Sequence, residues 1–129
     1  MGIQNLSYIK IHKALSAIKD LSHTRTIHSR GLTFKLITDS WITKYRARTF
    51  NEKEPEMLDW LDQNLLDEDG FFDIGANIVI YSIYSAIRNP NAKVIALEPE
   101  YSNLHELKQN ILKNKLTNNI FPYSIALDE

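Results

Sequence analysis

The chain has 129 residues, of which 43% are hydrophobic and 24% are charged, and its formal net charge is −1 at pH 7. This length fits one ordinary domain, and the apolar content suffices to bury a core, which excludes an intrinsically disordered chain. Cysteine is absent, so disulfides, thiolate zinc sites and cysteine nucleophiles are excluded and a reducing compartment fits.

The sequence contains no apolar run of the ~20 residues that a membrane-spanning helix needs. Near the N-terminus, Lys10, Lys13 and Lys19 interrupt the continuous apolar region that a signal peptide would require. We therefore expect a cytoplasmic protein without a membrane span.

Charge is distributed unevenly along the chain. Residues 1–50 contain nine Lys or Arg against two acids, whereas residues 51–73 contain nine acids against Lys53. The favoured interpretation is two solvated faces that compensate each other within one fold. The alternative is a basic arm for an anionic partner, such as a phosphorylated glycan or a membrane surface. No basic stripe with interleaved aromatic residues is present, so we expect no nucleic-acid partner.

The N-terminal part of the chain is expected to form a helix, a connector and a β-hairpin. Apolar residues at helical spacing predict an amphipathic helix over residues 3–20, with an apolar face made of Tyr8, Ile11, Leu15 and Ile18. The polar residues 21–30 are expected to form the connector. Alternating polarity then predicts a strand with Leu32, Phe34 and Leu36, a turn at Asp39 and Ser40, and a second strand with Trp41, Thr43 and Tyr45.

A further helix is expected to begin at Glu54 and Pro55, because proline and acidic residues favour the first turn of a helix. Its predicted buried face consists of Met57, Leu58, Leu61, Leu65 and Leu66. We expect residues 1–69 to form a helical and hairpin extension that precedes the main sheet.

From Gly70 onward the pattern predicts the order β-α-β-α-β. The expected elements are a strand at 71–74 buried on both faces, a buried helix at 78–87, a strand at 93–98, an amphipathic helix from about 102 to 118, and a strand at 120–127. Strands that alternate with helices imply an α/β fold with a parallel sheet wound right-handedly.

Two acidic residues fall where a ligand would bind in such a sheet, at the carboxyl ends of its strands. Asp73 lies beside the turn that follows the first strand, and Glu98 lies at the tip of the second strand. Glu98 follows Gly75 by somewhat more than the ~20 residues that are typical of a ribose-binding acid. The Glu98 carboxylate can accept hydrogen bonds from both hydroxyl groups of a ribose.

The turn after the first strand favours one nucleotide cofactor over others. Gly75 is its only glycine, so the G-x-G-x-x-G pattern of dinucleotide sites and the P-loop are both absent. Asp73 would repel a diphosphate but would attract an ammonium group. S-adenosylmethionine carries ribose hydroxyls and an ammonium group, and we expect it rather than NAD.

Four segments resemble the FkbM-type family of S-adenosylmethionine-dependent methyltransferases: DIGANI-x-IYS, VIALEPE, LKQNI-x-KN and SIALDE. The resemblance implies a Rossmann-like class I methyltransferase sheet and methylation of a hydroxyl group on a sugar, glycan or secondary metabolite. It also implies that Asp73, Gly75, Ala76 and Asn77 wrap the methionine part of the cofactor, with Glu98 on the ribose and Pro99 beside the adenine.

The sequence departs from this family in two respects. Val79 stands where the family has glycine, which either weakens cofactor binding or places a valine that packs against the sheet and leaves binding intact. The chain also stops after its third predicted strand, so we expect residues 70–129 to be the first half of the cofactor-binding domain in a fragment of a longer protein.

Other candidates are weaker, and no catalytic base is assigned. Histidines at 12, 23, 28 and 105 lack a partner at a useful spacing, and no metal site is expected. Arg46, Arg48 and Glu54 could reach the cofactor carboxylate or an acidic substrate, although a solvated hairpin charge is favoured for each arginine. Ser82 either faces the cofactor or bonds to its own backbone. Two alternative functions stay open: a non-catalytic cofactor-binding or structural fragment, and a dinucleotide-dependent oxidoreductase.

Overall fold

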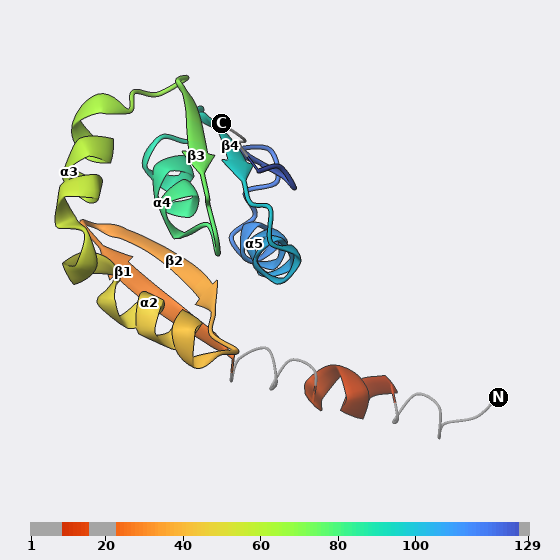
Figure 1. Ribbon diagram of the computed structural model, residues 1–129. Helices are drawn as coiled ribbons and strands as arrows, with labels where there is room; N and C mark the ends of the chain where they lie inside the picture. Colours follow the sequence, from red (N-terminus) through yellow and green to blue (C-terminus); the bar gives the residue numbers. More distant parts are fainter. Residues whose placement is uncertain (1–8, 16–22, 127–129) are drawn as a thin grey trace.

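The computed structural model describes residues 9–15 and 23–126 (Figure 1). Residues 9–15 are helical. The remaining helices and strands are β1 (Thr24–Ser29), β2 (Leu32–Ile37), α2 (Trp41–Lys53), α3 (Pro55–Asn64), β3 (Gly70–Ile74), α4 (Ile80–Arg88), β4 (Lys93–Leu97), α5 (Tyr101–Lys113) and β5 (Ile120–Tyr123).

The hairpin lies earlier in the chain than predicted. Strands β1 and β2 pair antiparallel, with Ser29 opposite Leu32, so the loop between them has only two residues. These residues, Arg30 and Gly31, have φ of 48° and 82°, as a type I′ hairpin turn requires. The predicted connector at 21–30 is therefore wrong, because it contains β1.

The predicted second strand of the hairpin is also wrong, since Trp41, Thr43 and Tyr45 belong to helix α2. Ser40 is the N-cap of this helix: its hydroxyl accepts from the Thr43 N–H at 3.1 Å, and the Thr43 hydroxyl accepts from the Ser40 N–H at 3.1 Å. This reciprocal capping box favours a helix over the strand that the alternating pattern had indicated.

The predicted N-terminal helix is only partly described, because Tyr8 and Ile18 lie outside the described residues. The helical segment 9–15 agrees with it, but Ile11 and Leu15 are each 58% exposed rather than buried. Amphipathic spacing identified the helix and not its packing partner, which depends on tertiary structure.

Helix α3 agrees with the sequence in its start and in most of its buried face. Pro55 is in the first turn, and Leu58, Leu61 and Leu65 are buried. Met57 and Leu66 are exposed, contrary to prediction. The buried face is narrower than the spacing suggested, and Leu66 lies beyond Asn64, where the helix ends.

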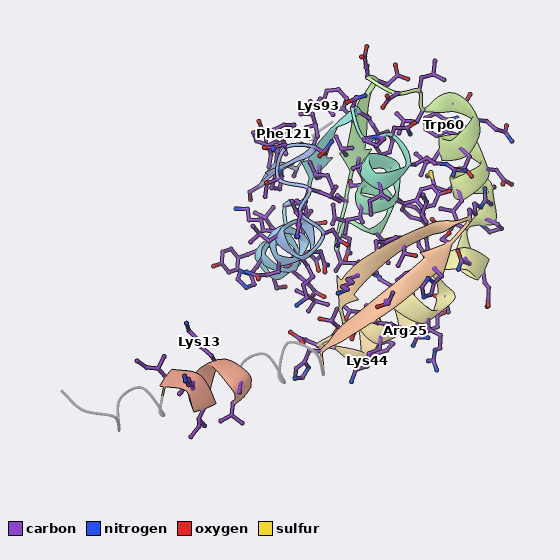
Figure 2. All side chains as sticks on the ribbon, turned by 180° about the vertical axis from the view of Figure 1, so that it is seen from behind. Lys13, Arg25, Lys44, Trp60, Lys93 and Phe121 are labelled. Atoms are coloured by element: carbon purple, nitrogen blue, oxygen red, sulfur yellow. The ribbon has the colours of Figure 1, made fainter. Side chains whose placement is uncertain are left out.

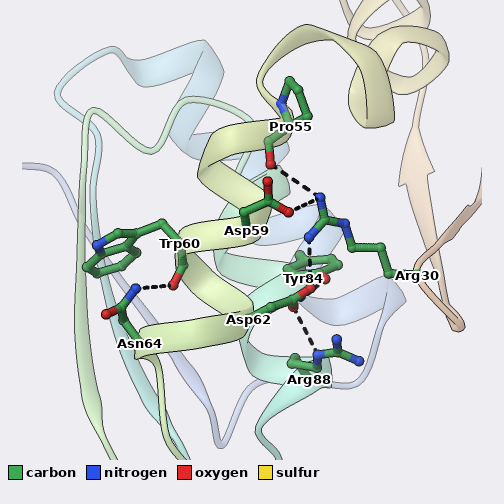
Figure 3. Close-up of polar contacts among 8 residues, drawn as sticks. All are labelled: Arg30, Pro55, Asp59, Trp60, Asp62, Asn64, Tyr84 and Arg88. Carbon is green, nitrogen blue, oxygen red and sulfur yellow. Dashed lines mark hydrogen bonds and ion pairs between the residues drawn. The ribbon is translucent and has the colours of Figure 1, made fainter.

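Polar contacts around Asp62 fix α3 to the hairpin turn and to α4 (Figure 3). Its carboxylate accepts from Arg30 at 2.9 Å, from Arg88 at 3.0 Å and from the Tyr84 hydroxyl at 2.6 Å. Burial acts to raise the pKa of Asp62, but these three hydrogen bonds outweigh it and lower the pKa overall. Burial, together with the bond to Asp62, raises the pKa of Tyr84 to about 12.

The predicted β-α-β-α-β order is confirmed. Strands β3, β4 and β5 form a parallel sheet in that spatial order. Helices α4 and α5 lie between this sheet and the hairpin, whose strand β2 contacts both helices (Figure 1). Two successive right-handed crossovers in the same direction place both helices on one face of the sheet.

The opposite face of the sheet carries apolar side chains that no described element covers. Phe72 and Ile74 are 65% and 60% exposed, so the prediction of a strand buried on both faces is wrong for β3. Phe72 is level with Ile95 and Phe121 across the three strands, so their side chains share this face. Figure 2 shows Phe121 of the parallel sheet and Arg25 of the hairpin on opposite sides of the molecule.

A hydrophobic cluster connects the hairpin and α2 to the helices of the sheet. The Phe50 ring lies 5.5 Å from that of Phe34 and 5.9 Å from that of Tyr84, measured between centroids. Residues 23–64 therefore pack directly on the part of the chain that carries the predicted site. Within residues 9–15 and 23–126, no helix has the length and apolar character needed to cross a membrane.

Candidate functional site

The turn that follows β3 is built from left-handed backbone. Gly75, Asn77 and Val79 have φ of 69°, 52° and 73°. The N–H groups of Gly75 and Ala76 donate to the Leu97 carbonyl at 2.9 and 3.0 Å, which ties the turn to the end of β4. We call residues 75–79 the cofactor loop, after the expectation from the sequence that this segment wraps the cofactor. Its backbone lies at the carboxyl edge of the sheet, where ligands bind in open α/β folds.

Val79 is the N-cap of α4 and is fully buried, with an exposed fraction of 0%. A β-branched residue in the left-handed region is an outlier that costs about 1–2 kcal/mol. A glycine at this position would meet the same backbone requirement without strain. Of the two interpretations offered for Val79, the packing one describes its side chain, which belongs to the core cluster.

The Glu98 carboxylate reaches the cofactor loop from the end of β4. One oxygen accepts from the Asn77 N–H at 2.8 Å, and the other accepts from the Glu100 N–H at 2.9 Å. The Asn103 side-chain amide makes a third, longer contact with this carboxylate at 3.5 Å. A carboxylate has about four acceptor positions, so these bonds leave capacity for a ribose hydroxyl. Pro99 follows Glu98 and is exposed.

Asp73 points toward the first turns of α4. Its carboxylate accepts from the Ser82 hydroxyl at 2.5 Å, so Ser82 does not bond to its own backbone as one interpretation proposed. Burial raises the pKa of Asp73, and the hydrogen bond from Ser82 partly offsets this increase. The hydrogen bond from Ser82 thus fixes the Asp73 carboxylate beside the cofactor loop.

A cavity of about 280 Å³ lies between the cofactor loop and α2. The loop side provides Asp73, Gly75, Ala76 and Asn77. The opposite side is formed mainly by α2 and α4 and includes Arg46, Thr49, Phe50, Lys53, Glu54 and Tyr81. Glu98 and Pro99 lie outside this lining, so four of the six predicted site residues meet here.

Arg46 crosses the cavity and donates a hydrogen bond to the Asn77 side-chain oxygen. It is half-buried on α2, so the favoured interpretation of a solvated hairpin charge is wrong for Arg46; Arg48, on the same helix, is exposed. The Tyr81 hydroxyl donates to Glu54 at 2.7 Å. Burial and this bond together raise the pKa of Tyr81.

Lys53 and Tyr81 are cavity residues that the sequence did not indicate. Arg46, Thr49 and Lys53 recur at intervals of three and four residues, which is the spacing of one helix face. The strand-like alternation of the same segment masks this helical signal. The cavity therefore combines two cations, Arg46 and Lys53, with two acids, Glu54 and Asp73.

The described histidines lie away from this cavity. The His23 ring is 3.0 Å from the Asp39 carboxylate, and the His28 ring is 3.1 Å from the Thr33 hydroxyl. His105 lines a second cavity of about 800 Å³ beside α5. The part of the chain that the structure describes contains no group of three or more side chains able to hold a metal ion.

The Rossmann-like sheet and its loop define the fold as that of class I methyltransferases, and solved structures share it. Precorrin-6y C5,15-methyltransferase from Geobacter metallireducens is 25% identical, with a TM-score of 0.51 over 57% of this chain and 39% of that protein. M. jannaschii TYW2 in complex with AdoMet is 24% identical, with a TM-score of 0.54 over 81% of this chain and 43% of that one.

A SAM-dependent methyltransferase from Agrobacterium tumefaciens is 14% identical, with a TM-score of 0.58 over 81% of this chain and 33% of that one. The chain thus spans less than half the length of each of these three structures. No protein-family model and no curated protein matches the sequence.

Proposed function

We propose that the protein binds S-adenosylmethionine at the cofactor loop and belongs to a methyltransferase. The observation that carries the proposal is the hydrogen bond between Glu98 and the Asn77 N–H, which joins the acid at the end of β4 to the left-handed loop after β3. Residues 70–129 would provide the first half of the cofactor-binding domain. Helix α2, which belongs to the N-terminal extension, would supply the wall that closes the cavity.

The charges in the cavity fit the amino-acid part of this cofactor. Arg46 and Lys53 would bind its carboxylate, while Asp73 and Glu54 would bind its ammonium group. Glu98 would hold the ribose hydroxyls, and Pro99 would lie beside the adenine. When bound, the cofactor supplies a methyl group activated by a sulfonium charge. The side chains of this chain bind and orient, and none is assigned as a base.

The acceptor we propose is a hydroxyl group on a sugar, glycan or secondary metabolite. This rests on the similarity of the DIGANI, VIALEPE and LKQNI segments to the FkbM-type family. Nucleic acid is left out of the proposal, because the chain has no basic stripe with interleaved aromatic residues. Similar structures include an rRNA methylase, described as putative, so the fold alone does not select an acceptor.

A second candidate is a non-catalytic cofactor-binding fragment. It is favoured by the apolar face of the sheet at Phe72 and Ile74, which no element of the described chain covers. In this case the chain would bind the cofactor without turning it over.

Calorimetric titration with S-adenosylhomocysteine tests the binding proposal. Glu98→Gln should weaken binding at least tenfold, because the amide cannot accept at both positions. Glu52→Gln, which changes an exposed acid on α2, should leave the affinity unchanged. Equal affinities in the parent chain and Glu98→Gln would refute the ribose assignment. Tight binding of NADH without binding of S-adenosylhomocysteine would favour an oxidoreductase instead.

A further inference from the structure

Two asparagines, Asn110 on α5 and Asn114 at its C-cap, act as hydrogen-bonding partners for the edge of strand β2. The Asn114 side chain accepts from the Lys35 N–H at 2.8 Å and donates to the Lys35 carbonyl at 2.7 Å. One helical turn earlier, the Asn110 side chain accepts from the Ile37 N–H at 2.8 Å. These bonds satisfy backbone groups at the edge of the hairpin, so α5 takes the place of a neighbouring strand.

Asn110 makes one more contact that Asn114 does not make. Its side-chain amide donates to the Ile78 carbonyl at 3.2 Å, inside the cofactor loop. Asn110 is fully buried, with an exposed fraction of 0%. A buried carboxamide with partners for both its oxygen and its nitrogen is rigidly oriented. One side chain therefore connects β2, α5 and the cofactor loop.

The bond from Asn110 acts on the peptide group that determines the unusual backbone of the loop. The carbonyl of this group belongs to Ile78 and is held by Asn110, while its N–H belongs to Val79 and donates to the Ala76 carbonyl at 2.8 Å. The next peptide group is held as well, because the Val79 carbonyl accepts from the Ile83 N–H at 2.9 Å. With the peptide groups on both sides of the Val79 Cα atom held, the left-handed φ of Val79 is fixed. A strained backbone conformation persists only where its surroundings hold it in this way.

We propose that Asn110 is a positioning residue that holds the cofactor loop in its left-handed conformation and couples it to the N-terminal hairpin. Its effect on ligand affinity rests on the proposed function, whereas its effect on the loop does not. Asn110 acts through the Ile78 carbonyl and has no assigned contact with the cofactor. The hairpin is then part of the binding site through its edge strand, in addition to the wall formed by α2.

The test compares Asn110→Ala with Asn114→Ala, because both remove a bond to the edge of β2 and only the first releases the loop. Hydrogen–deuterium exchange is followed in peptides that cover residues 75–80 and, as a reference, β4. Asn110→Ala should accelerate exchange of the loop amides at least tenfold relative to β4. Asn114→Ala should leave the same ratio within twofold of the parent. Binding of S-adenosylhomocysteine should weaken in the first variant and not in the second.

Equal loop exchange in the two variants would overturn the proposal. If Asn110→Ala does not fold, Asn110→Ser is measured in its place. If neither Asn110 variant folds while Asn114→Ala does, Asn110 is needed for the whole fold, and the positioning proposal is also overturned. Accelerated loop exchange in Asn110→Ala would support the positioning role even if the parent chain does not bind S-adenosylhomocysteine. Absence of binding by the parent chain would refute the proposed cofactor alone.

Discussion

The left-handed valine at position 79 leads to a prediction about how glycine and alanine compare there. Val79→Ala removes two buried methyl groups, which should cost about 2 kcal/mol of unfolding free energy, and leaves a side chain in the left-handed region. Val79→Gly removes one more carbon but releases the backbone strain. The difference between these two variants isolates the backbone contribution.

The size of this difference follows from three effects. Glycine loses about 0.8 kcal/mol for the missing methyl and about 1 kcal/mol for backbone entropy, but it gains about 1–2 kcal/mol because it tolerates the left-handed region. Alanine should therefore be more stable than glycine at position 79 by at most about 1 kcal/mol. At Ser85, a fully buried position inside α4, the same comparison lacks the compensating gain and should favour alanine by about 2 kcal/mol.

Urea unfolding of the four variants Val79→Ala, Val79→Gly, Ser85→Ala and Ser85→Gly measures both differences. The slope of free energy against urea should be the same in each pair, so the midpoint reports stability. An advantage of alanine at position 79 as large as that at position 85 would refute the left-handed conformation of Val79. An advantage smaller by 1 kcal/mol or more would support it.

Three further predictions concern charged residues. Arg46→Ala should weaken binding of S-adenosylhomocysteine at least tenfold in calorimetry. Arg48→Ala, which changes an exposed arginine of the same helix, should leave the affinity unchanged. Equal effects of the two variants would exclude a carboxylate-binding role for Arg46. Because folding raises the pKa of Asp73, stability should fall as the pH rises from 3.8, the pKa of the unfolded chain, through the folded pKa. Asp73→Asn should abolish this fall when urea unfolding is measured at several pH values. Because folding lowers the pKa of Asp62, its contribution to the free energy of unfolding should be full above pH 3.8 and be lost as the pH falls through the folded pKa. Asp62→Asn should lower the free energy of unfolding by about 1–2 kcal/mol at pH 7. An unchanged stability would contradict the role of its hydrogen bonds.

Local patterns in the sequence determined the parallel part of the fold and the centre of the site. Pro55 marked the start of α3, and the alternation of short apolar runs with longer periodic ones gave the β-α-β-α-β order. Asp73 and Glu98 could be placed at one edge, because parallel strands end on the same side of a sheet. These features depend on residues close together in the chain.

Tertiary structure decided the features that depend on residues far apart in the chain. The capping box at Ser40 is a local feature that makes a helix of a segment with strand-like alternation, but only packing brings Arg46 of this helix to Asn77, 31 residues away. The uncovered side of β3 resulted from two crossovers in the same direction, which composition does not encode. The roles of Val79 and Asn110 depend on backbone angles and on a carbonyl 32 residues away from Asn110. The sequence is sufficient to predict residues of the candidate site, whereas tertiary packing determines their backbone conformation and their contacts.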